Sequence, residues 1–231
     1  MVFVNPALLY LLQALLVDLF IHKTFQCCPH PFYQCLIVIV FDRGSNLYVP
    51  VMYTLMTHKT AESYWYALSK IVVQSKLKLN VRSFTCGFEI AMINAGKIHF
   101  PEGHHNGCLF RLKQAWRRRL ISHIGCLAEE VAYAMREGIL DLLTVIPPEK
   151  IEDIGIPFLR SLVKKNLDAI NIEIWDELWD YIVPFWLKVV GIDRWNICLQ
   201  DGQYKEIKNR TNNGWRHTTA FMVTNSLRNL L

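Results

Sequence analysis

A long apolar run, FYQCLIVIVFD from Phe32 to Asp42, most limits how this chain can fold. It is rich in β-branched residues and continuous in apolar character, which is typical of a strand buried on both faces. The residues that follow, DRGSN, supply the backbone conformations of a hairpin turn. The next run, LYVPVMYTLM, predicts a second strand, in which Pro50 indicates an edge position or a bulge.

The pattern then changes to helical spacing. Lys59 to Lys78 predicts an amphipathic helix that Thr60 can cap. NVRSFTCGFEIAMINA predicts a short strand that runs into a second helix, and KIHFP predicts another short strand ended by proline. Strands that alternate with helices after a hairpin predict a mixed α/β sheet covered by helices.

From Leu109 onward the pattern is helical almost to the end of the chain. This pattern predicts that the second half is a helical insertion or extension packed onto the α/β half. We therefore expect an N-terminal apolar helix over residues 1–20, an α/β core over residues 21–125, and a helical insertion with a C-terminal helix of the same domain over residues 126–231.

Composition favours a folded protein of a reducing compartment. Hydrophobic residues make up 52% of the 231 residues and charged residues 19%, which excludes intrinsic disorder. The net charge of +5 permits contact with nucleic acid without requiring it. The 7 cysteines are an odd number scattered through apolar segments, so free thiols and an intracellular location are expected.

The N-terminal segment is the one candidate for membrane contact or targeting. Its apolar run from Ala7 is broken by Gln13 and ends at Asp18, which is shorter than the roughly 20 residues that span a bilayer. It also lacks the basic start and small-residue cleavage site of a signal peptide. A buried or amphipathic helix without a membrane partner is favoured, and a cleaved or anchored segment is the alternative.

A basic run offers candidate phosphate contacts: Arg111, Lys113, Arg117, Arg118 and Arg119. Such side chains bind phosphates by charge and bidentate hydrogen bonds. A solvated helix face explains the same run equally well.

Two pairs have the spacing of zinc ligands: His105 with Cys108, and His123 with Cys126. Small buried thiols are the simpler interpretation. The acids of the first half, Asp18, Asp42, Glu62 and Glu89, are each explained by a surface or capping role.

Several ordered landmarks resemble the Mutator-like element (MULE) transposases. They are KTFQCCPHPFYQCLIVIVFDRGSNLYVPVMYTLMTHKTAESYWYAL, TCGFEIAMINA, IHFPEGHHNGCLFRLKQAW, WDELWDYIVPFWL…WN and NRTNNGWRH. The resemblance implies an RNase H-like fold with a helical insertion, and an ancestral DNA cleavage and strand-transfer activity. In active relatives three carboxylates hold two magnesium or manganese ions.

This chain departs from the family at all three acids. The family's Asp-Gly-Thr-Phe appears as HKTF, which places His22 at the acid's position and Lys23 at the glycine's. The second motif, Asp-Phe-Glu, appears as GFE, with Gly87 at the acid's position. In the last motif Arg216 stands at the acid's position, or a short deletion before Gly214 has removed the acid.

The family's Cys-x-x-His pair keeps Cys108 but has Arg111 in place of the histidine. Neighbouring residues do not replace the three lost acids. Asp18 lies four residues before His22, about 13 Å away along a strand. Glu89 alone would not hold two hard cations. We therefore expect no transposition activity and no metal cofactor.

Two kinds of function follow from the resemblance. The first is an inactive, transposase-derived domain, expected to be nuclear or intracellular. The second is a DNA- or protein-binding module that uses the basic run and the amide-rich NRTNN with Arg210. A membrane-associated role is a weaker third. We find no counterpart here of the family's separate DNA-recognition module. We therefore interpret the chain as a trimmed or decaying copy of a transposase, or as a co-opted relic.

Overall fold

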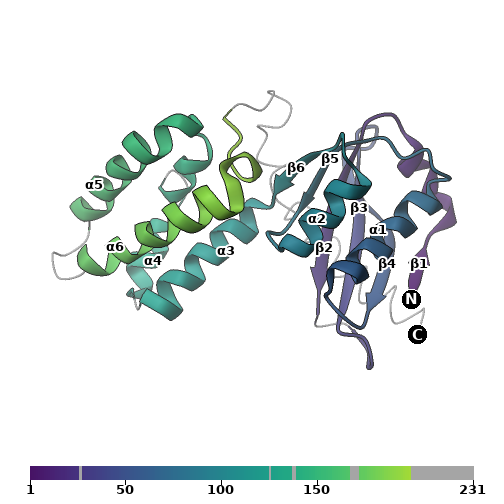
Figure 1. Ribbon diagram of the computed structural model, residues 1–231, viewed down its shortest axis with the longest axis horizontal. Helices are drawn as coiled ribbons and strands as arrows, with labels where there is room; N and C mark the ends of the chain where they lie inside the picture. Colours follow the sequence, from purple (N-terminus) through teal and green to yellow (C-terminus); the bar gives the residue numbers. More distant parts are fainter. Residues whose placement is uncertain (26–27, 125, 137–138, 167–171, 199–231) are drawn as a thin grey trace. The chain divides into compact units, whose positions relative to one another are not determined.

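The computed structural model describes residues 1–25, 28–124, 126–136, 139–166 and 172–198 (Figure 1). The chain forms two compact units, the first ending at Cys108 and the second beginning at Leu109. The sequence predicts a helical pattern from Leu109 onward, where the second unit begins, although it assigned residues 109–125 to the α/β core. The structure groups these residues with the second unit because the basic helix packs with the helices that follow it.

A mixed sheet forms the first unit. Its described strands are β1 (Val2–Val4), β2 (Val17–Thr24), β3 (Gln34–Asp42), β4 (Leu47–Met56), β5 (Val81–Cys86) and β6 (His104–Gly107). Their order across the sheet is β1-β4-β3-β2-β5-β6. The pairs β1–β4, β4–β3 and β3–β2 are antiparallel, whereas the pairs β2–β5 and β5–β6 are parallel. The predicted mixed α/β architecture is confirmed.

Strand β3 is buried on both faces, as its continuous apolar run predicts. On one face Leu36 and Val38 pack with the apolar sides of helices α1 (Ala61–Gln74) and α2 (Ile90–His99), which both lie on that face in Figure 1. On the other face Ile37 and Ile39 pack with Phe20 and Leu55. Strand β2, which carries one of the motif positions, pairs directly with this core strand.

The hairpin between β3 and β4 forms at DRGSN. The Asp42 carboxylate accepts hydrogen bonds from the backbone N–H groups of Gly44 at 3.1 Å and Ser45 at 3.3 Å. Pro50 lies next to a bulge, since Ile39 pairs with Pro50 and Val38 pairs with Met52. The bulge is confirmed, while β4 is an interior strand rather than an edge.

Helix α1 begins as its sequence predicts. The Thr60 hydroxyl accepts a hydrogen bond from the Ser63 N–H at 3.2 Å, which satisfies a free donor of the first turn. Tyr64, Leu68 and Ile71 point into the core. The helical period of the sequence is therefore the period of the buried face.

Two expectations for local structure were wrong. Residues 1–20 do not form one helix: a short 3-10 helix, η1 (Pro6–Gln13), lies between β1 and β2. Pairing of Val17–Thr24 with β3 and β5 takes the apolar end of the segment into the sheet. KIHFP is also not a strand, because Lys97 to His99 end helix α2 and the strand follows at His104.

The second unit is helical, as predicted. Its described helices are α3 (Leu109–Arg119), η2 (Leu120–Ile124), α4 (Ala128–Ala134), η3 (Leu140–Thr144), η4 (Pro148–Lys150), η5 (Ile151–Gly155), α5 (Ile156–Asn166), α6 (Ile172–Tyr181), η7 (Ile182–Gly191) and η8 (Ile192–Arg194). Its core contains buried tryptophans, with the Trp116 ring 6.1 Å from Trp186 and 6.3 Å from Trp195. Within the described ranges, no helix is both long and apolar enough to cross a membrane.

Candidate functional site

Two motif positions meet at one edge of the sheet. Strands β2 and β5 are parallel, and their last paired residues are Phe20 and Thr85. His22 lies two residues further along β2, and Gly87 lies two residues beyond Thr85, directly after β5 ends. Because parallel neighbours end at the same edge, the structure brings these two positions together.

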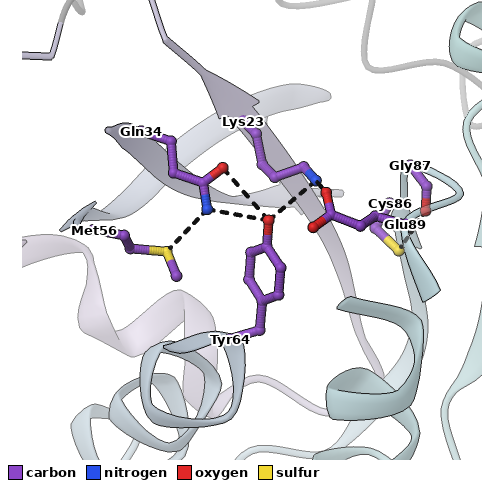
Figure 2. A network of polar contacts seen from close by, with 7 residues as sticks. All are labelled: Lys23, Gln34, Met56, Tyr64, Cys86, Gly87 and Glu89. Atoms are coloured by element: carbon purple, nitrogen blue, oxygen red, sulfur yellow. Dashed lines mark hydrogen bonds and ion pairs between the residues drawn. The ribbon is translucent and has the colours of Figure 1, made fainter. Parts of the chain in front are cut away.

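An ion pair joins the residues beside these positions, as Figure 2 shows: the Lys23 ammonium binds the Glu89 carboxylate. The Lys23 side chain is 15% exposed and that of Glu89 33% exposed, so water screens the pair only in part. Glu89 precedes the first residue of helix α2 without capping it through its side chain. Its carboxylate is thus oriented toward a cation of the neighbouring strand.

Tyr64 and Gln34 extend this contact into the core (Figure 2). Lys23 donates to the Tyr64 hydroxyl at 3.3 Å and lies 5.2 Å from the centre of its ring. The Gln34 amide donates to the same hydroxyl at 3.1 Å and to the Met56 thioether at 3.6 Å. Both Gln34 and Tyr64 are buried. The lysine is thus held by a carboxylate, a hydroxyl and an aromatic face.

Burial sets the protonation of Tyr64. It raises the pKa of the hydroxyl strongly, the Gln34 hydrogen bond lowers it, and the Glu89 carboxylate raises it further. Tyr64 is therefore neutral near pH 7 and acts as a hydrogen-bond donor and acceptor. It is not placed to serve as a base.

The donors at this edge do not fit a pair of magnesium or manganese ions. Hard divalent cations require several oxygen ligands, mostly carboxylates. Here an imidazole and a glycine stand at the motif positions, and the nearby carboxylate of Glu89 is neutralised by Lys23. Among the described residues, no three His, Cys, Asp or Glu side chains gather to hold a metal.

Asp18 is not a surface or capping acid, which corrects the sequence interpretation. It is 7% exposed and accepts hydrogen bonds from Arg82 Nε at 2.8 Å and Ser83 Oγ at 2.7 Å. Arg82 Nη2 and Arg43 complete an ion-pair cluster around it. Asp18 therefore joins β2 to β5 at the opposite end of the strand from His22. Asp42 serves the turn, and Glu62 lies exposed in the first turn of α1.

Comparison with known families gives a match over part of the chain. Residues 20–115 match the family model of the MULE transposase domain. This segment, called the MULE segment below, is similar to that domain. The match includes both motif positions, His22 and Gly87, and helices α1 and α2. It confirms the resemblance that the sequence landmarks indicate. No curated protein matches the chain.

The zinc candidates of the MULE segment have other neighbours. His105 Nε2 lies 3.3 Å from Cys86 Sγ, and its ring packs 5.0 Å from Phe84. Cys108 is buried, and its N–H donates to the Cys86 carbonyl at 2.9 Å. These contacts explain His105 and Cys108 as part of the packing between β5 and β6.

The second zinc pair lies after the MULE segment. Burial raises the pKa of the Cys126 thiol to about 11, with smaller contributions from Glu130 and Glu177. A metal-binding cysteine requires the thiolate, which this environment disfavours. The side chain of His123 lies outside the described residues, so the pair itself stays a prediction.

The basic run lies on α3, which begins inside the MULE segment and continues past it. Arg111 donates to Gln114 at 2.8 Å, and Lys113 pairs with Asp141 at 3.3 Å. Arg119 stacks 5.1 Å from the centre of the Tyr181 ring. The remaining members of the run, Arg117 and Arg118, are exposed. Arg210 and Arg216 lie outside the described residues.

Sequence reasoning missed Gln34 and Tyr64 as members of the site. Gln34 is a polar residue within the most apolar run of the chain, and it is fully buried. A buried amide needs a hydrogen-bond partner, which is the signal that an interior contact exists. The identity of that partner depended on the packing of α1 against β3.

Proposed function

We propose that this chain is a transposase-derived domain of RNase H-like fold that has lost metal-dependent DNA cleavage. The MULE match supports the ancestry, and the antiparallel β4-β3-β2 followed by parallel β5 and β6 supports the fold. The single observation that carries the loss of cleavage is the ion pair between Lys23 and Glu89.

The ion pair supports inactivity for a chemical reason. An ammonium group supplies positive charge, but it cannot activate a water or a strand end as a divalent metal does. Lys23 stands where the family has a glycine. Its side chain therefore occupies space that glycine, which has no Cβ, would leave open. Glu89, the acid two residues after Gly87, then has a fixed partner.

The test combines metal binding with cleavage. Purified protein is titrated with magnesium or manganese while its thermal midpoint is followed, and cleavage of labelled DNA with terminal inverted repeats is assayed in the same samples. We expect no metal-dependent shift beyond that of a chelator-treated control and no cleavage. Metal-dependent stabilisation together with cutting would show that other carboxylates rebuild the site.

A second candidate function, DNA binding without cleavage, is favoured by the exposed Arg117 and Arg118. Changing both to Gln should weaken duplex binding and flatten its salt dependence, because fewer phosphate counterions are released. The charge-matched control changes Lys164 and Lys165, which are exposed on α5. Equal losses in both variants would indicate attraction by net charge alone. DNA as the partner would agree with a nuclear location.

A further inference from the structure

Two exposed aromatic rings stand side by side just after strand β2. Phe25 is 50% exposed and Tyr33 is 48% exposed, although both belong to a unit with a well-packed core. Their ring centres lie 5.5 Å apart in an edge-on arrangement. Large rings that remain half in water leave much apolar surface unburied, which is characteristic of a binding surface.

The backbone holds these rings in place. The Tyr33 N–H donates to the Met56 carbonyl at 2.8 Å, which continues the ladder between β3 and β4 by one residue. At the other end of the segment, Phe25 directly follows β2, and its carbonyl accepts from the Cys28 N–H at 3.4 Å. The rings are thus carried on strand ends, so binding would require little ordering of the backbone.

A cationic group lies at one ring of the pair. The Lys59 ammonium lies 5.8 Å from the centre of the Tyr33 ring, and Lys59 is itself exposed. Lys23, two residues before Phe25, neutralises Glu89. An anionic ligand with flat rings therefore meets exposed aromatic surface and a positive charge.

We propose that Phe25, Tyr33 and Lys59 form a binding site for single-stranded nucleic acid. Unpaired bases stack on the two rings, and Lys59 contacts the adjacent phosphate. Stacking on aromatic side chains is the common mode of binding single strands without sequence preference, because every base has a flat face. In duplex DNA the bases are already stacked and paired, so the rings have no base face to contact. The site is independent of the proposed loss of cleavage, because it concerns binding alone.

Fluorescence anisotropy with a labelled oligo-dT of roughly ten nucleotides tests the site, since single-strand sites commonly cover about 4 to 16 nucleotides. Phe25→Leu and Tyr33→Leu keep apolar bulk but remove the stacking face, and each should weaken binding about tenfold. Tyr33→Phe should bind like the wild type. The matched control is Tyr10→Leu, which changes a tyrosine that is 63% exposed in the same unit.

The outcomes separate stacking from charge. Lys59→Gln should weaken binding and reduce its salt dependence, while the leucine variants should weaken binding at every salt concentration. Circular dichroism and thermal midpoints confirm that each variant is folded. Wild-type affinity in both leucine variants, or an equal loss of duplex affinity in those variants, would overturn the proposal. A cleavage assay on the same protein reports separately on the proposed function.

Discussion

Lys23 and Glu89 form an ion pair at the edge where parallel strands β2 and β5 end, beside both described motif positions. The pair gives the acid of this edge a partner from within the chain. Because an ammonium and a divalent cation would compete for the same carboxylate, restoring acids at the motif positions alone should not restore metal binding.

The first prediction tests this competition. His22→Asp with Gly87→Asp should show no manganese-dependent rise in thermal midpoint, whereas the triple variant that adds Lys23→Gly should show one. Saturation at 100 times the dissociation constant would stabilise the folded state by about 2.7 kcal/mol. That corresponds to a shift of roughly 5–10 °C for a chain of this size.

Glu89→Gln in the triple variant is the control. It should abolish the manganese shift if the rebuilt site uses that carboxylate. Equal shifts in the double and triple variants would contradict the role of Lys23, and they would do so whether or not wild-type protein cleaves DNA.

Breaking the Asp18 cluster should destabilise the protein strongly. Asp18→Asn leaves the guanidinium of Arg82, whose side chain is 17% exposed, without its carboxylate. Removing one partner of a buried ion pair costs about 3–5 kcal/mol of unfolding free energy. Urea denaturation measures this cost, with Asp42→Asn in the exposed turn as the control, expected to lose much less unfolding free energy than Asp18→Asn. A loss at Asp18 no larger than at Asp42 would show that the cluster contributes little.

Tyr64 and Gln34 should be energetically coupled. Tyr64→Phe removes the hydroxyl that accepts from both the Gln34 amide and Lys23, so a buried donor loses its partner. The expected cost is about 1–3 kcal/mol. Gln34→Leu should cost a similar amount, but the double variant should lose about 0.5–1.5 kcal/mol less than the sum of the two. Additive losses in urea denaturation would argue against the contact.

The parts of the fold that sequence reasoning predicted are those set by local patterns. The apolar run of β3, the turn at Asp42 and the cap at Thr60 each depend on neighbours within a few residues. Strand β6, with the sequence HHNG, was missed because it has no β-branched residue and is ordered by pairing with β5. The N-terminal apolar segment was misassigned because its end is a strand by virtue of two distant partners.

The features of the candidate site also divide into those that local sequence predicts and those that only the fold shows. The replaced acids at His22 and Gly87 are visible in the sequence once the family landmarks are aligned. The partner of Glu89 is not, because Lys23 lies 66 residues away in sequence and on a neighbouring strand. Asp18 was assigned to the surface because no local pattern shows that Arg82 would pair with it. Long-range pairing is therefore the information that only the fold supplies.

The last prediction concerns alkaline pH. Burial raises the pKa of the Tyr53 hydroxyl to about 12, with a smaller contribution from Cys35. An unfolded tyrosine ionises near pH 10, so the folded state holds this proton more tightly. The resulting stability is fully present below about pH 10 and is lost as the pH rises toward about 12.

The Tyr53→Phe variant tests this effect, because phenylalanine cannot ionise. It should reduce the loss of unfolding free energy between about pH 9 and 11.5 by about 1–2 kcal/mol. Urea titrations across this range measure the effect, with the exposed Tyr10→Phe as the control. The same pH dependence in wild type and Tyr53→Phe would assign the alkaline loss to other groups, of which the Tyr64 hydroxyl, whose pKa is also raised by burial, is the first to examine.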